Sequence, residues 1–332
     1  MNIKRLILIS VSVLALVCSV SCKKEEEETK PYLIGNPVFD LPAFGLPGDT
    51  FTFKSKGCMA EDSKKDSQIG YYWMAPPVRT DRDTTMEYTF TLPDSLCTVK
   101  VSCYSFSPDY YGTSTTKTIT VISADREQGS IKGKTFDPKR DFVFTDPRDG
   151  REYWCTTIGS TDWFKENLAW LGSGHTLQDC DETAGVFGNY YSWDEAMTAC
   201  PEGWRVASRQ DWADAAKSVT GLDYSLDENM YDVAGAFMGN IMFNGERMWA
   251  YWPDVTISDE LGLALMPSGY GVIGERTEFK AMYEYAAVWT SDESGSDRAF
   301  YRYIFVERPD FMIGTTDRDS FAASVRCVRD HQ

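Results

Sequence analysis

The sequence predicts a two-domain protein of the α+β class, in which an N-terminal β-sandwich precedes a domain of mixed helices and strands. Its 332 residues are about twice the length of a common domain, which favours two folding units. Residues 31–123 show only short strand-like alternation, whereas clear amphipathic helical patterns follow from residue 192 onward. With 42% hydrophobic and 14% aromatic residues, the chain can fill packed cores.

The N-terminus predicts an export signal. Lys4 and Arg5 precede an apolar run over residues 6–17, which is too short to span a bilayer but suits a signal peptide. The run leads into "SVSC", which resembles the lipobox of bacterial lipoproteins. The resemblance implies a lipoprotein signal peptide over residues 1–21.

The same resemblance implies acylation of Cys22, whose acyl chains would hold the protein at the outer membrane. Cys18 is a weaker site because Val17 is bulky, and a plain secretory signal is the alternative. Residues 22–30 form a charged tether that cannot pack. This tether resembles the acidic signal that sends lipoproteins of Bacteroidota-type bacteria to the outer face of the outer membrane. We therefore expect a lipid-anchored protein on the exterior face of the outer membrane. The inner face of that membrane is the alternative location.

The charge balance narrows the choice of partners. A formal net charge of −17 repels phosphate backbones and anionic membranes, so nucleic acid is not an expected partner. An acidic surface is also ordinary for exported proteins.

The first domain, residues 31–123, is expected to be an immunoglobulin-like β-sandwich because its short strands recur between turn residues. Cys58, Trp73 and Cys103 occur in the order that suits an inter-sheet disulfide packed on a buried Trp. The pattern resembles immunoglobulin-like and polycystic-kidney-disease-type repeats. Cys97 shares a strand face with Cys103, so it competes for the same partner and is the candidate for an unpaired thiol.

A linker is expected over residues 124–134, and a second domain over residues 135–330. Within that domain, Asp149-Gly150 marks the turn of a hairpin.

Two helices are predicted in the second domain by their start signals. Ser192 with Glu195 forms one capping box, and Ser208 with Asp211 forms another, each followed by apolar residues at helical spacing. Pro201 separates the two helices.

The cysteines of the second domain suggest a disulfide bond that links its beginning and its end. Cys200 ends the first helix, and Cys327 lies in the last strand-like run, so a bond between them would enclose nearly the whole domain. Such a loop contributes on the order of 4–5 kcal/mol by chain entropy. Cys155 with Cys180 is the remaining predicted pair, although their pairing and that of Cys97 stay open.

Six blocks of the second domain carry a family resemblance. They are "DPRDGREYWCTTIG", "DWFKENLAW", "YSWDEAMTACPEGWRVASRQDWADA", "LGLALMPSGYG", "AVWTSDES" and "SVRCVRD". In this order they resemble the Fibrobacter succinogenes major paralogous domain over roughly residues 135–330. The family in turn looks like the C-type lectin fold, which implies a bond between a helix Cys, here Cys200, and a last-strand Cys, here Cys327. The chain departs from the family in "RVAS", where "RLPS" or "RLPT" is usual, and in residues 220–255, where no family residue can be placed.

A lectin-like fold raises the question of calcium. None of the calcium-binding triplets of sugar-binding C-type lectins occurs here, and no segment has EF-hand spacing, so no metal site is assigned. Calcium is not indicated by motif, although a site built from distant loops stays open. Trp252 and Asp254 in "YWPD" are the candidate ligand-binding residues, with core packing as the alternative for Trp252.

The residue inventory argues against an enzyme. There are two histidines, His175 and His331, and no zinc, thiol–redox or phosphate-loop motif. Formylglycine-generating enzymes share the expected fold, but they use a pair of nearby cysteines, and Cys327 has no such neighbour. No cofactor is expected.

We therefore expect a non-catalytic surface lipoprotein that presents a lectin-like recognition domain for polysaccharide, host glycan or protein. Its variable loops, mainly residues 220–280, would bind the ligand. The alternatives are a structural or adhesive subunit of a surface fibre and, less favoured, an enzyme of the formylglycine-generating type.

Overall fold

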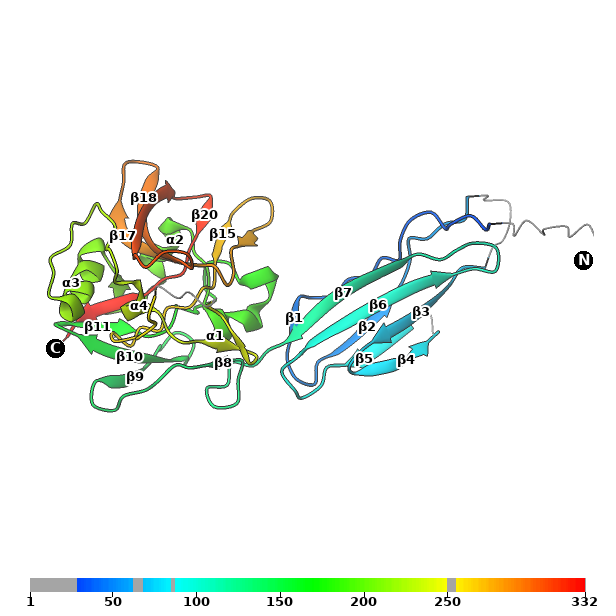
Figure 1. Cartoon of the computed structure of the whole chain (residues 1–332), viewed down its shortest axis with the longest axis horizontal. Helices are drawn as coiled ribbons and strands as arrows, with labels where there is room; N and C mark the ends of the chain where they lie inside the picture. Colours follow the sequence, from blue (N-terminus) through cyan, green and yellow to red (C-terminus); the bar gives the residue numbers. More distant parts are fainter. Residues whose placement is uncertain (1–28, 62–67, 85–86, 250–254, 332) are drawn as a thin grey trace, which may run out of the picture.

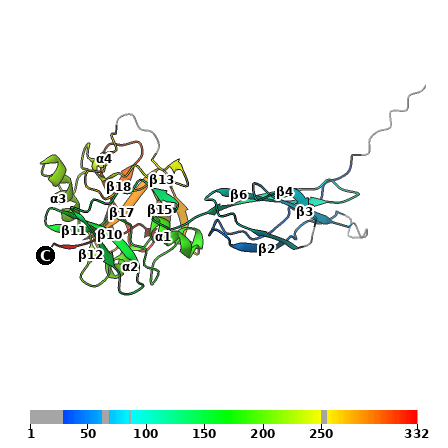
Figure 2. The ribbon, with the colours of Figure 1, turned by 90° about the horizontal axis from the view of Figure 1, so that it is seen from below.

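The computed structural model describes residues 29–61, 68–84, 87–249 and 255–331. These residues form two units arranged end to end, so the molecule is elongated (Figure 1). The N-terminal unit consists of strands, and the C-terminal unit also carries the helices (Figure 2). In these stretches of chain no helix has both the length and the apolar character needed to cross a membrane.

The N-terminal unit contains one sheet of five strands and one of two. The five pair in the order β1-β7-β6-β3-β4, and β2 pairs antiparallel with β5. The strands are β1 (Phe44–Gly45), β2 (Thr50–Lys54), β3 (Gly70–Ala75), β4 (Arg79–Asp83), β5 (Glu87–Thr91), β6 (Thr98–Phe106) and β7 (Ser114–Val121).

A single core joins these two sheets. On β5, Tyr88 and Phe90 are buried while their neighbours are exposed, because successive side chains of a strand point to opposite faces. Trp73 of β3 is fully buried and stacks on Tyr88 of the other sheet, with ring centroids 5.3 Å apart. The two sheets therefore enclose a common aromatic core.

The predicted disulfide between Cys58 and Cys103 is absent from this core, since both thiols are free. Cys103 is buried on β6, directly opposite Trp73 on the neighbouring strand. Cys58 lies outside the named strands, with its Sγ 3.7 Å from the Thr113 hydroxyl. The order Cys–Trp–Cys did not specify the bond, because the Cys58 loop turns its sulfur toward Thr113. Cys97 is also free.

The C-terminal unit is built from four small sheets in its described residues. The largest has the order β12-β21-β11-β10-β9, and the three-stranded sheets have the orders β14-β13-β8, β16-β15-β20 and β17-β18-β19. The strands are β8 (Ile131–Lys132), β9 (Asp141–Thr145), β10 (Glu152–Ile158), β11 (Thr161–Phe164), β12 (Arg205–Val206), β13 (Met242–Phe243), β14 (Glu246–Arg247), β15 (Tyr270–Val272), β16 (Glu278–Lys280), β17 (Tyr285–Glu293), β18 (Arg298–Phe305), β19 (Met312–Asp317), β20 (Phe321–Ala322) and β21 (Cys327–Asp330). β9 and β10 form the hairpin predicted around Gly150.

Both predicted helices are confirmed, together with their caps. α2 (Trp193–Ala199) begins after Ser192, and α3 (Arg209–Thr220) begins after Ser208, each with a complete capping box. The other helical segments are one turn long: η1 (Leu177–Asp179), η2 (Asp181–Thr183), α1 (Ala184–Phe187) and α4 (Ala234–Phe237).

The prediction of an α+β, C-type-lectin-like fold is wrong. Strands make up 39% of the structure and helices only 12%, and the strands are divided among several small sheets. The reason is that α2 and α3 contain seven and twelve residues, while most of the remaining apolar pattern is used by short strands. The two clear helix start signals therefore led the fold-class prediction to overestimate how much of the chain is helical.

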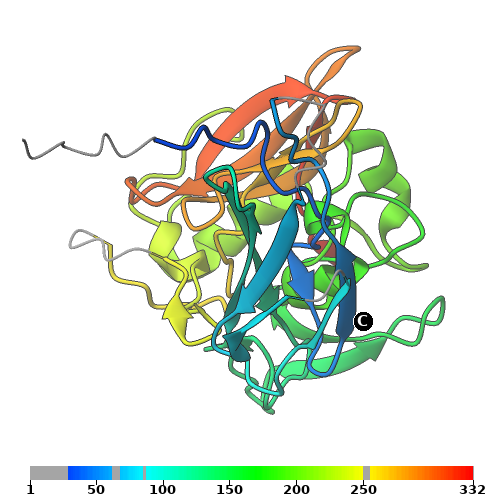
Figure 3. The same cartoon turned by 90° about the vertical axis from the view of Figure 1, so that its right-hand side faces the viewer.

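The two units meet through a small apolar junction. The rings of Phe44 on β1 and Phe187 on α1 lie 6.3 Å apart, and Ile122 is fully buried between the units. The Asn244 side chain donates a hydrogen bond to the Val121 carbonyl across the junction, at 2.9 Å. In Figure 3, which looks along the long axis, the N-terminal unit lies in front of the C-terminal one. The residues expected as a linker include β8, which pairs with β13 of the C-terminal unit.

Candidate functional site

The structure describes some of the predicted site residues and not others. Cys22, Trp252 and Asp254 lie outside the described residues. Cys200 and Cys327 form a disulfide, as predicted, which ties the end of α2 to the start of β21. Both residues border the core built on Trp289, so this bond belongs to the framework.

Cys155 and Cys180 are free thiols and not the predicted pair. Cys155 is fully buried on β10 in the core of the C-terminal unit. Cys180 lies beside the junction, where its Sγ donates to the Glu182 carboxylate at 3.0 Å and is 4.0 Å from the Phe44 carbonyl. The two sulfurs belong to different parts of the unit, which spacing along the chain could not reveal.

A cluster of aromatic side chains on β15, β17 and β18 is the most suggestive surface of the C-terminal unit. It consists of Tyr270, Tyr285, Tyr301 and Tyr303, all half-buried, and we call it the tyrosine surface. β17 pairs with β18, and β15 pairs with β20 beside them (Figure 1). The four rings come from three strands within residues 270–303, and pairing of β17 with β18 and packing of β15 beside them bring the rings together.

The rings of this surface contact one another closely. Tyr285 stacks on Tyr303 with centroids 4.7 Å apart and planes 13° apart. Tyr303 neighbours Tyr301 at 5.4 Å, and Tyr270 neighbours Tyr285 at 5.5 Å. Such a packed row is held at a low cost in side-chain entropy, because each ring has only two rotatable angles.

The hydroxyl groups of the tyrosine surface also converge. The Tyr285 and Tyr301 hydroxyl oxygens are 3.5 Å apart. Burial raises the pKa of both phenols, with the neighbouring tyrosine hydroxyls contributing to the rise for Tyr285. Both phenols therefore stay neutral at physiological pH, where each can donate and accept a hydrogen bond.

Packing beneath the rings fixes their position. Gly314 of β19 lies under Tyr301, and a Cβ at this glycine would come within 2.7 Å of the tyrosine ring. Trp289 of β17 is fully buried beside Tyr301 on the same face, with the ring centroids 6.2 Å apart, and its indole donates a hydrogen bond to the Tyr191 carbonyl at 2.7 Å. The rings therefore rest on a rigid base.

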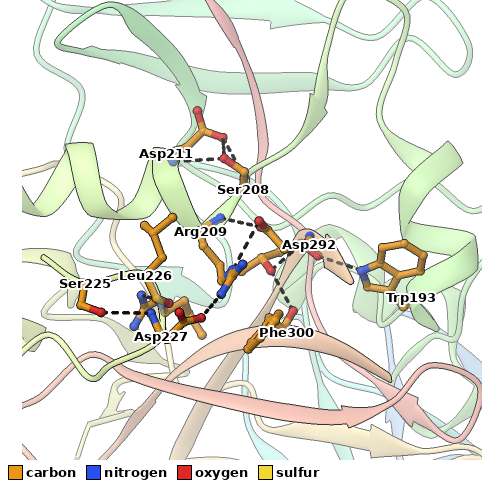
Figure 4. A network of polar contacts seen from close by, with 11 residues as sticks. Trp193, Ser208, Arg209, Asp211, Ser225, Leu226, Asp227, Asp292 and Phe300 are labelled. Atoms are coloured by element: carbon orange, nitrogen blue, oxygen red, sulfur yellow. Dashed lines mark hydrogen bonds and ion pairs between the residues drawn. The ribbon is translucent and has the colours of Figure 1, made fainter. Parts of the chain in front are cut away.

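A polar network holds the opposite face of β17 and β18 against α3 (Figure 4). The Arg209 guanidinium lies between the carboxylates of Asp292 and Asp227, and its Cζ is 3.9 Å from the centre of the Phe300 ring. Arg302 is fully buried beside it and donates to the Leu226 carbonyl. This network positions the strands that carry the tyrosine surface.

The surroundings of Arg302 partly disfavour its protonated, charged form. Burial, together with repulsion from Arg209, lowers the pKa of Arg302 to about 10. The nearby carboxylates of Asp292 and Asp227 favour the charged form. Arg302 is therefore still protonated at neutral pH.

A cleft of about 110 Å³ lies where the 124–134 segment meets the C-terminal unit. Glu166 pairs there with Arg126 at 3.3 Å and with Lys134 at 3.6 Å, and Arg126 also stacks on Trp154. Burial lowers the pKa of Lys134. These charges are satisfied by one another, so they fasten the segment to the domain and leave little for a ligand.

The described residues contain no group of three or more His, Cys, Asp or Glu placed to hold a metal ion. His175 contacts the Thr277 hydroxyl at 3.0 Å, and His331 contacts the Asp162 carboxylate at 2.8 Å. Neither histidine ring is hydrogen-bonded to a serine or cysteine side chain of the described residues.

The tyrosine surface was not predicted from the sequence. The alternation in residues 299–305, where Tyr301 and Tyr303 are two positions apart, was a signal that both rings share one strand face. Tyr270 and Tyr285 carried no comparable signal, because their contact depends on how β15 and β17 pack together.

Comparisons with known proteins identify the C-terminal unit. The family model described as the Fibrobacter succinogenes major domain matches residues 156–329. No curated protein matches the chain.

One solved structure resembles the chain weakly. It is described as a quinonprotein alcohol dehydrogenase-like protein from Bacteroides thetaiotaomicron, with 10% identity and a TM-score of 0.20. The alignment covers 86% of this chain and 62% of that one, so the chain spans less than two thirds of its length. A TM-score this low supports no conclusion about fold or activity.

Proposed function

This chain belongs to the family of the Fibrobacter succinogenes major domain, and we propose that it is a non-catalytic polysaccharide-binding lipoprotein of the outer membrane. In this proposal acylated Cys22 anchors the chain on the exterior face, and the N-terminal unit is a spacer. The C-terminal unit binds glycan at the tyrosine surface. No cofactor takes part.

The observation that carries the proposal is the contact between four half-buried tyrosine rings on β15, β17 and β18. The faces of aromatic rings carry partial negative charge, and they attract the slightly positive C–H groups on the face of a sugar ring. Phenol hydroxyls can also bond to sugar hydroxyls as donors or as acceptors. A row of such rings suits successive sugar units of a chain.

The elongated arrangement supports a spacer role for the N-terminal unit. The described chain begins at the end of that unit that lies far from the C-terminal unit (Figure 1). An anchor at Cys22 would therefore leave the tyrosine surface away from the membrane, where an extracellular polymer can reach it.

A binding screen tests the proposal. Residues 29–332 are applied to a panel of polysaccharides and host glycans, with calcium and then with a chelator. We expect binding that persists in chelator, because the tyrosine surface contains no strong cation ligand. Binding that is lost in chelator would assign the contact to a cation site elsewhere.

The matched variants are Tyr303→Ala and Tyr231→Ala. Tyr303 belongs to the tyrosine surface, whereas Tyr231 is 65% exposed elsewhere in the same unit. We expect Tyr303→Ala to raise the Kd about tenfold and Tyr231→Ala to leave it unchanged. Equal effects of the two variants, or no binding to any glycan, would contradict the proposal. Concentration-dependent self-association in place of binding would favour the fibre subunit.

A further inference from the structure

The far end of the N-terminal unit carries an exposed apolar patch, which we call the tip patch. It consists of Tyr32, Ile34, Met59 and Tyr111, whose exposed fractions are 68%, 47%, 61% and 46%. Scattered apolar side chains are normal on a protein surface, but neighbouring ones that form a continuous patch commonly mark an interaction site. The four residues of the tip patch are adjacent in space.

Two pairs of contacts show this adjacency. The rings of Tyr32 and Tyr111 lie 5.2 Å apart, and their residues form a parallel bridge. Ile34 and Met59 form an antiparallel bridge with two backbone hydrogen bonds of 2.8 and 2.9 Å. Tyr32 and Ile34 flank the buried Leu33, so their side chains point to the same, outer side.

The chain enters the structure at this same end. Lys30 donates a hydrogen bond to the Pro108 carbonyl at 2.5 Å, which fastens the start of the chain to the loop between β6 and β7. That loop lies at the end of the unit opposite the junction (Figure 1). The tip patch therefore surrounds the point where the N-terminal segment joins the folded unit.

The length of the chain outside the structure limits how far the tip patch can be from an anchor. Seven residues lie between Cys22 and Lys30, so the chain takes eight steps from one to the other. A fully extended chain covers at most about 3.5 Å per residue, so Lys30, at the start of the folded unit, lies within ~28 Å of Cys22. A short tether raises the local concentration of lipid at the tip patch, which favours contact without a strong intrinsic affinity.

We propose that the tip patch rests on the lipid surface of the membrane that holds Cys22. This inference deepens the proposed function and rests on its lipid anchor. Tyrosine suits the boundary between headgroups and acyl chains, because its ring is apolar and its hydroxyl is polar. Ile34 and Met59 supply purely apolar contact. Because the chain has a net charge of −17, the attraction is apolar rather than electrostatic.

Hydroxyl-radical footprinting tests the proposal, since it reports the solvent access of individual side chains. The full acylated chain is bound to vesicles of phosphatidylcholine and phosphatidylethanolamine, and a Cys22→Ser chain is mixed with the same vesicles. We expect the oxidation rates of Met59, Tyr32 and Tyr111 to fall about fivefold in the acylated chain. The rate for Tyr231, in the other unit, is expected to stay the same.

Two double variants provide matched controls. In the acylated chain, Ile34→Asp with Met59→Asp is expected to return Tyr111 to the oxidation rate of the Cys22→Ser chain. Leu222→Asp with Tyr231→Asp alters apolar residues of the C-terminal unit that are at least as exposed overall, at 60% and 65%, and is expected to leave Tyr111 protected.

Mass spectrometry of the N-terminal peptide separates the ways in which the test can fail. An unacylated Cys22 would overturn both the anchor and the tip-patch proposal. An acylated Cys22 with an unprotected tip patch would overturn the tip-patch proposal alone. Protection of the Cys22→Ser chain that grows with protein concentration in lipid-free buffer would assign the tip patch to a second copy of the chain and also overturn it.

Discussion

Arg209 contacts the Asp292 carboxylate through both its backbone N–H and its side chain. The Arg209 N–H donates to one carboxylate oxygen at 2.7 Å, and the Arg209 Nε lies 3.3 Å from the other. The pair joins the first turn of α3 to the end of β17, and Arg302 is buried beside it. A carboxylate at residue 292 therefore accepts a hydrogen bond at the start of α3, neutralises Arg209 and favours the charged form of Arg302.

Asp292→Ala is expected to lower the free energy of unfolding by about 2–3 kcal/mol, because it removes one charge-assisted hydrogen bond and one ion pair and leaves two neighbouring cations less compensated. Urea unfolding followed by circular dichroism measures the change. Lys217→Ala is the control, since Lys217 pairs with Asp223 at the exposed surface, and its effect is expected to stay within about 0.5 kcal/mol. Equal effects would show that the Arg209–Asp292 pair is no more than a surface contact.

The Cys200–Cys327 bond is expected to contribute strongly to stability, because it closes a loop with a sequence separation of 127 residues. The double variant Cys200→Ala, Cys327→Ala should unfold at lower urea concentration, with a loss of about 2–5 kcal/mol. Adding a reductant should destabilise the wild-type chain to a similar extent while leaving the double variant unchanged. A wild-type chain insensitive to reductant would contradict the prediction.

Asp259 is expected to give the free energy of unfolding an unusual dependence on pH. Burial raises the pKa of its carboxyl from 3.8 to about 6, although nearby cationic side chains favour the ionised form. Between these values the folded chain binds more protons than the unfolded chain, so this residue makes stability fall as pH rises from about 4 to about 6. Above that window its contribution is constant.

Asp259→Asn tests this dependence and retains the hydrogen bond that the Ala264 N–H donates to the side-chain oxygen at 2.8 Å. The variant should match the wild-type near pH 4 and be more stable at pH 7, by on the order of 2 kcal/mol. Asp214→Asn, at an exposed position of α3, is the control. A wild-type chain that gains stability relative to Asp259→Asn between pH 4 and pH 6 would refute the assignment.

The free thiols should differ in reactivity. Burial raises the pKa of Cys103 to about 11 and of Cys180 to about 12, and it raises that of Cys155 as well. Because the thiolate is the reactive form, iodoacetamide at pH 8 is expected to label the half-buried Cys58 and Cys97 first. Peptide mapping before and after denaturation gives the order. A 58–103 or 155–180 bond in the mapped peptides would restore the pairing expected from sequence.

Local signals in the sequence were sufficient where the structure depends on neighbouring residues. The capping boxes at Ser192 and Ser208 located both longer helices, because each is a contact between residues three positions apart. The Cys200–Cys327 bond was also predictable, since Cys200 ends a recognisable helix and Cys327 lies in the final strand. Six spaced blocks were enough to identify the family.

Only the tertiary structure decided the fold class, the other thiols and the candidate site. The α+β prediction failed because short strands leave weaker patterns than capped helices, so their total share could not be judged from the sequence. Cys58 and Cys180 are free because their loops direct the sulfurs toward Thr113 and Glu182, and loop direction is not encoded by spacing. The tip patch joins residues as far apart as Tyr32 and Tyr111, and the tyrosine surface joins three strands within residues 270–303, so both form only when the strands pack together.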